Sequence, residues 1–450
     1  MYRKLLIWLI LSSIFLDDYL VGGNSSEVRA SMPFDLYYYY IFFLLVILYY
    51  IKTFRSFLPY PKYFLMACTL FFSASILGAF SSNLIGFSML KQMLGILFSG
   101  AAYYATIELE EFDIKKLFVQ YTKLAIIVAG IGVIQEMLYL GGFHSLFGNV
   151  KRMSIGFYRV YSIMGEPYFL AVAITPALFY FFNKVFGIKA FREINAYNLF
   201  ALSTLFLCFV FTFSTGGIIG LALIILITAY NRLGKKIYIL LPLLALYVAG
   251  NANNFKINIY EFQVRIEDTF KGFISGGDLD REELAEMNSS SFALVSNFII
   301  AQESIKRNPY FGCGIGNHEH LSNEMFVGLF GKDFLIRFGN FNAKDANSLF
   351  IRMMSEGGLL GLLLLLYIYL KPFKFRKGIK DPSLVLYTLI NQACFIMFSI
   401  RIVRTGNYIS QGFMFFIFLY VISSKEISQV LKEKRALDKS ESDQVIPSLD

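Results

Sequence analysis

Long apolar runs recur along almost the whole chain and are separated by short polar segments. A helix needs about 20 apolar residues to cross the hydrocarbon of a bilayer, and about twelve runs of the chain approach this length. Hydrophobic residues make up 56% of the chain and charged residues only 16%, which is too apolar for a soluble globule of this size. We therefore predict an all-α polytopic membrane protein. The predicted spans cover residues 4–16, 36–51, 62–80, 84–107, 117–140, 167–183, 196–213, 217–231, 237–250, 346–370, 382–400 and 409–423.

Lysine and arginine gather in alternate segments between these spans, and cytoplasmic segments of membrane proteins retain such cations. This distribution accounts for most of the net charge of +9, so nucleic-acid binding is not expected. It predicts that both termini are cytoplasmic. The first run ends in Asp17 and Asp18 instead of a small-residue cleavage site, so we expect it to remain as a helix.

The spans and loops divide the chain into four parts. Residues 1–250 hold spans 1–9, residues 346–423 hold spans 10–12, and residues 424–450 form a charged cytoplasmic tail. The polar segment 251–345 lies on the outer face and is too long for a plain connection. We expect it to contain helices of its own and to form a cap between spans 9 and 10.

Two outer segments carry more cations than acids, one around Arg159 and one that holds Arg401 and Arg404. Arginine in short external loops opposes insertion in this direction, so its presence needs a compensating reason. A guanidinium group matches phosphate oxygens and keeps its charge when it is partly desolvated. These arginines are therefore candidates to hold a lipid-linked phosphate or pyrophosphate. The alternative is that they pair with Glu166 or contact lipid headgroups.

Charged residues inside the predicted spans are costly unless they pair or face the interior of the bundle. Arg352 and Glu356 are four residues apart and share a helix face, which predicts a structural ion pair, with a functional role as the alternative. The four cysteines are widely separated and show no spacing typical of metal or redox sites, so we predict neither a disulfide framework nor a thiolate zinc site.

Several short motifs together resemble the superfamily of O-antigen polymerases (Wzy) and O-antigen ligases. The motifs are RVYSIMGEP at 159–167, TFSTGG at 212–217, NPYFGCGIG at 308–316, DANSLF at 345–350 and EGGLLG at 356–361. The segment RIVRTGNY at 401–408 is similar to a loop of polymerases in particular. Each motif alone is short, but together, in this order and at this spacing, the motifs extend over residues 159–423.

This resemblance implies a GT-C-type glycosyltransferase of the bacterial inner membrane that acts in lipopolysaccharide biosynthesis on the periplasmic side, without metal, cofactor or nucleotide sugar. A polymerase transfers the growing glycan from undecaprenyl pyrophosphate to a hydroxyl group of the next lipid-linked repeat unit. Its implied partners are these lipid-linked oligosaccharides, membrane lipid and a chain-length regulator protein. Charge develops on the leaving pyrophosphate, so preplaced arginines can stabilise the transition state, and a base must orient the attacking hydroxyl.

The chain departs from the family pattern at Ala346, where ligases and many relatives have a histidine that acts as the base. A ligase-type histidine mechanism at this position is therefore excluded. The candidates to replace it are Glu166, Asp345 and His318. Asn347 and Tyr408 are expected to support them.

Each candidate also has a plain structural interpretation. Glu166 followed by proline is a good helix start, Asp345 and Asn347 suit the cap of a helix that begins near 346, and His318 suits a surface position in a polar loop. An O-antigen ligase and a polysaccharide flippase remain as alternative functions. The chain shows no internal repeat of the kind that many transporters have.

Overall fold

The computed structural model describes residues 2–16, 38–54, 61–143, 157–234, 267–269, 271–274, 281–338, 342–374 and 381–444. Within these ranges the chain is helical and contains no β-strand, which confirms the predicted all-α class. The first part contains α1 (Tyr2–Ser12), the 3-10 helix η1 (Ser13–Phe15), α3 (Tyr38–Phe54), α4 (Lys62–Ser81), α5 (Phe87–Leu109), α6 (Ile114–Leu140), α7 (Pro167–Phe186), α8 (Ala196–Phe211) and α9 (Thr215–Leu233). The second part contains α12 (Arg281–Glu286), α13 (Ser289–Arg307), α14 (His318–Phe330), α15 (Lys332–Phe338), α16 (Leu349–Leu370), α17 (Pro382–Arg404) and α18 (Phe413–Gln444).

Seven helices of the described part are long and apolar enough to cross a membrane. These helices are α4, α6, α7, α9, α16, α17 and α18, and α3 and α8 contain shorter apolar stretches. Large apolar side chains on the outside of the bundle, such as Leu70 of α4 (65% exposed) and Phe200 of α8 (64% exposed), have no protein to cover them. Such surfaces are stable against lipid and costly in water, so the chain is an all-α membrane protein.

Eleven of the twelve predicted spans coincide with a helix, and the run 237–250 lies outside the described residues. The helix α1 has 11 residues, so at about 1.5 Å per residue it is shorter than the hydrocarbon thickness of about 30 Å. With η1, which continues it, α1 packs inward, since Ile10 and Leu11 of α1 and Ile14 of η1 are fully buried.

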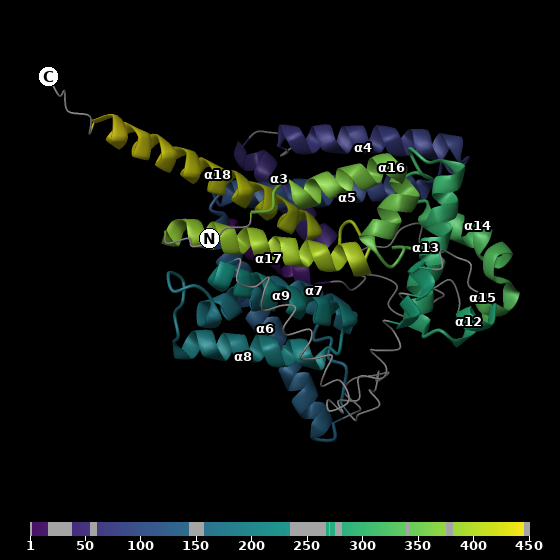
Figure 1. The fold of residues 1–450 in the computed structure, drawn as a ribbon, viewed down its shortest axis with the longest axis horizontal. Coiled ribbons are helices and arrows are strands. Elements are labelled where there is room, and N and C mark those ends of the chain that lie inside the picture. The colour runs from purple at the N-terminus through teal and green to yellow at the C-terminus, as the bar shows by residue number, and fades with distance from the viewer. Residues whose placement is uncertain are drawn as a thin grey trace.

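The four helices α12–α15 form an insert between the apolar helices of the first and second parts. In Figure 1 the helices α4, α8 and α17 run in similar directions, and the insert lies at the right-hand side of the view, below the end of α4. The insert has its own aromatic core, in which the ring of Phe292 stacks on that of Phe338 with centroids 4.4 Å apart. The contact of α13 with α16 joins the insert to the rest of the bundle.

The helix α17 lies in the centre of the bundle, in contact with α7, α9, α16 and α18. Two buried amides, Asn231 of α9 and Gln392 of α17, donate to each other's oxygen over 2.7 and 3.0 Å. A pair of this kind fixes the position of the two helices because each unpaired amide would be costly in this setting. The last turn of α17, which carries Arg401 and Arg404, therefore has a defined position near the insert.

The helix α16 is broken at Gly358, where φ is 56° and ψ is −148°, and Figure 1 shows its sharp bend. The glycine-rich loop 308–316 supplies hydrogen bonds at the break: the N–H of Leu359 donates to the carbonyl of Pro309 over 2.9 Å, and the N–H of Cys313 donates to the carbonyl of Ser355 over 2.9 Å. A Cβ atom on Gly312 would stand 2.3 Å from the Ser355 oxygen, so the loop needs glycine to approach this closely. The loop thereby orients the first half of α16.

Candidate functional site

The turn before α16 and the turn after α17 lie directly against each other. A Cβ atom on Gly406 would stand 1.9 Å from the carbonyl oxygen of Asp345, so only glycine permits this contact. The hydroxyl of Ser348 donates to the carbonyl of Ile402 over 2.6 Å, and the hydroxyl of Thr405 donates to Oδ2 of Asp345 over 3.1 Å. The DANSLF and RIVRTGNY motifs thus form one structural unit.

A buried ionic cluster lies under this unit. The Nε atom of Arg352 donates to Oε1 of Glu356 over 2.9 Å, and its Nη1 donates to the carbonyl of Gly406 over 3.0 Å. The hydroxyl of Tyr408 donates to Oε2 of Glu356 over 2.8 Å, and the guanidinium lies 4.3 Å from the centroid of the Tyr408 ring. The predicted Arg352–Glu356 pair is confirmed. Burial and the negative charge of Glu356 hold the pKa of Tyr408 well above its usual value, so Tyr408 remains a donor.

The backbone of the turn before α16 is strained. Ala346 and Asn347 have φ angles of 53° and 57°, in the left-handed region that non-glycine residues adopt at a cost. Asn347 is 6% exposed; its Oδ1 accepts from Asn342 over 3.2 Å, while its Nδ2 has no hydrogen-bond partner within the described structure. Strain and an unsatisfied buried donor are both typical of binding and catalytic sites.

The helix α16 begins at Leu349, so the prediction that Asp345 and Asn347 cap a helix starting near residue 346 is wrong. The cap is Ser348, whose Oγ accepts from the backbone N–H of Ile351 over 3.3 Å. The Oδ1 atom of Asp345 accepts from the backbone N–H of Asn347 over 3.0 Å instead, and this bond supports the turn that precedes the helix. The half-buried carboxylate is therefore fixed beside Thr405.

Arg401 is completely buried and is surrounded by the turn that follows it. Its guanidinium donates to Oε1 of Gln411 over 2.8 Å and to the carbonyl of Asn407, and it lies 4.5 Å from the centroid of the Phe413 ring. These contacts hold the segment 405–412 in place. The side chain of Arg401, which the sequence predicts to contact pyrophosphate, is thus buried below the surface of the site.

Arg404, one turn further along α17, is partly exposed. Its Nη1 donates to the carbonyl of Ser290 in α13 over 3.4 Å, so it bridges the bundle and the insert. The phenol of Tyr168 lies within electrostatic range of Arg404 and Asp345, and its buried hydroxyl has no hydrogen-bond partner in the described structure. A Cβ atom on Gly216 would stand 2.3 Å from the Tyr168 ring, so the TFSTGG motif leaves room for this ring.

His318 lies at the start of α14 and is completely buried, so its interpretation as a surface residue is wrong. Its Nε2 atom donates to Oδ1 of Asn297 over 2.8 Å, and Nδ1 has no hydrogen-bond partner among the described residues. Burial, together with the nearby positive charge of Arg352, lowers the pKa of His318 to about 3. The imidazole is therefore neutral at physiological pH.

Glu166 and Arg159 belong to the segment that precedes and begins α7. Glu166 is exposed and is the N-cap of α7, with Pro167 as the first helical residue, as its structural interpretation predicts. Arg159 is partly exposed and precedes Val160, whose N–H donates to the carbonyl of Phe211 over 3.1 Å at the end of α8. Glu166 lies two residues before Tyr168, whose phenol is within electrostatic range of Asp345.

The structure therefore gathers most, though not all, of the predicted site residues. The residues that it brings together are Asp345, Asn347, Arg401, Arg404 and Tyr408, with His318 linked to them through the charge of Arg352. Sequence reasoning missed Tyr168 and Gln411. The only indication of Tyr168 in the sequence is that it directly follows the GEP motif.

The site offers anion-binding and hydrogen-bonding groups. Within the described residues, no group of three or more His, Cys, Asp and Glu side chains is arranged to hold a metal ion. Arg404 supplies a positive charge, Asp345 supplies a carboxylate that can accept a proton from a hydroxyl, and the amide of Asn347 supplies a donor. Comparison with models of protein families and with curated proteins finds no match for this chain.

Proposed function

We propose that the chain is an O-antigen polymerase. It transfers a growing glycan from undecaprenyl pyrophosphate to a sugar hydroxyl group of the next lipid-linked repeat unit. The proposal follows from the resemblance of its motifs to the O-antigen polymerase and ligase superfamily. The observation that carries it is the direct contact between the DANSLF and RIVRTGNY motifs, which are more than 50 residues apart and join at Gly406 and Asp345.

In the proposed mechanism, Arg404 binds the pyrophosphate of the donor. As the bond between C1 of the sugar and the phosphate oxygen breaks, negative charge develops on the leaving group, and a guanidinium already in place stabilises it without reorganisation. Arg401 acts from behind by holding the turn that follows α17. Arg159 is the third proposed cation, from the segment before α7.

Asp345 is the proposed base for the acceptor hydroxyl. Its carboxylate is fixed by the N–H of Asn347 and by the hydroxyl of Thr405, so its orientation is set before the substrate arrives. Glu166 and His318 are the other candidates. His318 is buried and neutral, which suits a residue that supports Arg352 and the insert.

The proposed topology has twelve spans, with both termini in the cytoplasm and the α12–α15 insert on the periplasmic side of the inner membrane. The distribution of lysine and arginine between the spans supports this orientation. In this arrangement the end of α17 and the insert face the compartment in which lipid-linked repeat units are joined. The insert acts as the cap that is characteristic of the GT-C type.

The decisive experiment is a gel of lipopolysaccharide from a strain that lacks this protein. If the protein is a polymerase, only single repeat units should remain attached to the lipid A core in this strain, because ligation still proceeds. Complete loss of repeats would instead indicate a ligase, and an unchanged ladder would contradict both. With the purified chain in liposomes that present lipid-linked repeats on one face, new glycosidic linkages identify a transferase, whereas movement without linkage identifies a flippase.

A further inference from the structure

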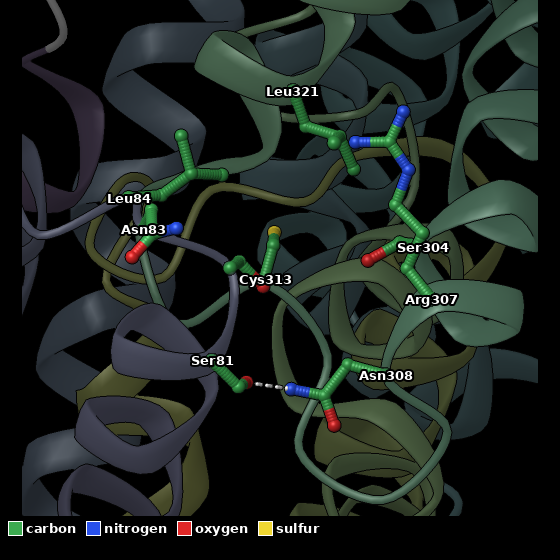
Figure 2. Close-up of a pocket in the computed structure, with 9 residues that line it drawn as sticks. Ser81, Asn83, Leu84, Ser304, Arg307, Asn308, Cys313 and Leu321 are labelled. Atoms are coloured by element: carbon green, nitrogen blue, oxygen red, sulfur yellow. Dashed lines mark hydrogen bonds between the residues drawn. The ribbon is translucent and has the colours of Figure 1, made fainter.

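A cavity of about 170 Å³ lies beside the glycine-rich loop. It is enclosed by the turn between α4 and α5, the last turn of α13 and the glycine-rich loop (Figure 2). The side chains of Asn83 and Arg307 are exposed at its edge, so the cavity opens to the surface. Cys313 and Ser304 are buried on its inner side. No residue of this cavity belongs to the proposed transfer mechanism.

The inner side of the cavity presents hydrogen-bond acceptors. The hydroxyl of Ser304 donates its hydrogen to the carbonyl of Ser355 over 2.8 Å, so lone pairs of its oxygen are what remain for a ligand. The hydroxyl of Ser81, which is exposed at the edge of the cavity, is arranged in the same way, since it donates to the carbonyl of Gly78 over 2.9 Å. It also accepts from Nδ2 of Asn308, as the dashed line in Figure 2 shows, which leaves one lone pair.

The edge of the cavity presents donors. Figure 2 shows the guanidinium of Arg307 and the side-chain nitrogen of Asn83 on opposite sides of the cavity. The charge of Arg307 is already balanced by Glu324, whose Oε1 lies 2.8 Å from Nη1. Burial raises the pKa of the Cys313 thiol to about 12, so this side chain is uncharged as well.

This combination of donors and acceptors selects a neutral polyhydroxyl ligand. A sugar hydroxyl both donates and accepts, so it can satisfy the donors at the edge and the acceptors inside. A phosphate or carboxylate only accepts, so the hydroxyls of Ser304 and Ser81 can donate to it only by giving up their bonds to the carbonyls of Ser355 and Gly78. Leu84 and Leu321 also line the cavity and can cover the apolar C–H face of a sugar ring.

The size of the cavity limits the ligand to a single ring. Pockets that enclose drug-sized ligands have volumes of about 300–1,000 Å³, and this cavity of about 170 Å³ is smaller. Its wall also adjoins the buried ionic cluster, because Ser304 bonds to the carbonyl of Ser355, the residue before Glu356. A ring held here lies against the same loop that orients the first half of α16.

We propose that this cavity is a subsite for one neutral sugar ring of the glycan. The identity of the glycan as substrate rests on the proposed function, whereas the match to a polyhydroxyl ring rests on the residues themselves. The subsite positions a repeat unit at the contact between the insert and the spanning helices. It therefore contributes to the choice of sugar and has no part in the transfer step.

Binding is tested with the full chain in nanodiscs by saturation-transfer NMR. The probes are neutral methyl glycosides of common hexoses and N-acetylhexosamines, with methyl glucuronide and inorganic phosphate as anionic probes. Asn83→Gly removes the amide and keeps the backbone, because Asn83 has a φ of 53° that glycine adopts freely. Ser82 also lines the cavity, and Ser82→Trp fills it. Lys332→Ala, at a position in α15 outside the cavity, is the control.

We expect a neutral glycoside to bind to the wild type at millimolar concentration and about fivefold more weakly to Asn83→Gly. Its binding should be lost with Ser82→Trp and retained with Lys332→Ala. The proposal is overturned if no neutral glycoside binds, if Asn83→Gly binds as well as the wild type, or if only the anionic probes bind. Asn83→Gly decides the result if Ser82→Trp fails to fold. Because binding needs no transfer, a positive result stands even if the chain proves not to be a polymerase.

Discussion

The hydroxyl of Tyr408 donates a hydrogen bond over 2.8 Å to Oε2 of Glu356, and this bond joins the turn after α17 to the first half of α16. Both side chains are buried, with exposures of 4% and 0%. The carboxylate therefore depends on protein donors, since water does not reach it. Two donors from different segments, Arg352 and Tyr408, hold the two oxygens of Glu356 in one orientation.

Tyr408→Phe is expected to lower stability. It leaves Oε2 of Glu356 without its donor, and an unsatisfied buried acceptor costs about 1–3 kcal/mol. Thermal unfolding of the detergent-solubilised protein measures the effect. Tyr310→Phe is the matched control because Tyr310 is 62% exposed. Equal melting temperatures for the two variants would contradict the importance of this hydrogen bond.

Arg352 and Glu356 are expected to be strongly coupled. Removal of one partner, by Arg352→Met or Glu356→Gln, leaves a buried polar group without its pair and costs about 3–5 kcal/mol. The double variant should cost less than the sum of the two. The exposed Arg307–Glu324 pair, with side-chain exposures of 52% and 53%, should show a coupling of at most about 1 kcal/mol. A double-mutant cycle on unfolding measures both, and additive effects at Arg352 and Glu356 would refute the coupling.

Acidification is expected to destabilise the protein through His318. Its pKa is about 3 in the folded chain, whereas an exposed histidine has a pKa of 6.5, so between these values the unfolded state binds the extra proton. Stability therefore rises with pH from about 3 to 6.5 and levels off above, and a change from pH 7 to pH 5 costs about 2 kcal/mol.

The variant His318→Gln tests this dependence because glutamine does not titrate and its amide can still donate to Asn297. We expect its melting temperature to fall less than that of the wild type between pH 7 and pH 5. His320 lies on the same helix and is exposed, and His320→Gln is the control that should behave as the wild type does. The same fall in all three proteins would show that other groups cause the acid sensitivity.

The membrane helices could be predicted from the sequence because each is encoded locally. The run 382–400 became α17 (Pro382–Arg404), and the run 62–80 became α4 (Lys62–Ser81), with small differences at the ends. The break in α16 could not be predicted in the same way. Its Gly357-Gly358 pair is visible in the sequence, but the hydrogen bonds that stabilise the break come from Pro309 and neighbouring residues of a distant loop.

The residues of the site could be predicted from the sequence by their type, whereas the burial and contacts of each side chain could be predicted only in part. Arg401 and Arg404 stand three residues apart in one motif, and both were candidates for pyrophosphate binding. The turn after α17 buries Arg401 completely and leaves Arg404 partly exposed, because the side chain of Gln411 and the carbonyl of Asn407 surround Arg401. The spacing of Arg401 and Arg404 in the sequence does not reveal this difference in burial, because the path of the turn after α17 determines it.

Gly406→Ala is expected to disrupt the contact between the two motifs. The added Cβ would stand 1.9 Å from the carbonyl of Asp345, so the backbone has to move, at a cost of about 1–3 kcal/mol. Gly328→Ala is the control, since a Cβ there meets no atom within 4 Å and alanine favours the helix α14. In a complemented deletion strain, Gly406→Ala should shorten the glycan ladder and Gly328→Ala should restore it. Full ladders with both variants would show that the two turns need not touch.

Arg401→Ala and Arg404→Ala are expected to differ, although both should abolish long glycan chains. Arg401→Ala removes the donors to Gln411 and Asn407 from a buried position, so it should also lower the melting temperature.

Arg404→Ala should leave the melting temperature close to that of the wild type, because its hydrogen bond to Ser290 is long at 3.4 Å and lies in a partly exposed position. Arg404→Lys should restore activity only in part, since an ammonium group lacks the planar fork that matches phosphate oxygens. Arg337→Ala, at an exposed position in α15, is the control and should give normal ladders. A full ladder with Arg404→Ala would exclude Arg404 from pyrophosphate binding, and unchanged stability of Arg401→Ala would exclude its role in holding the turn.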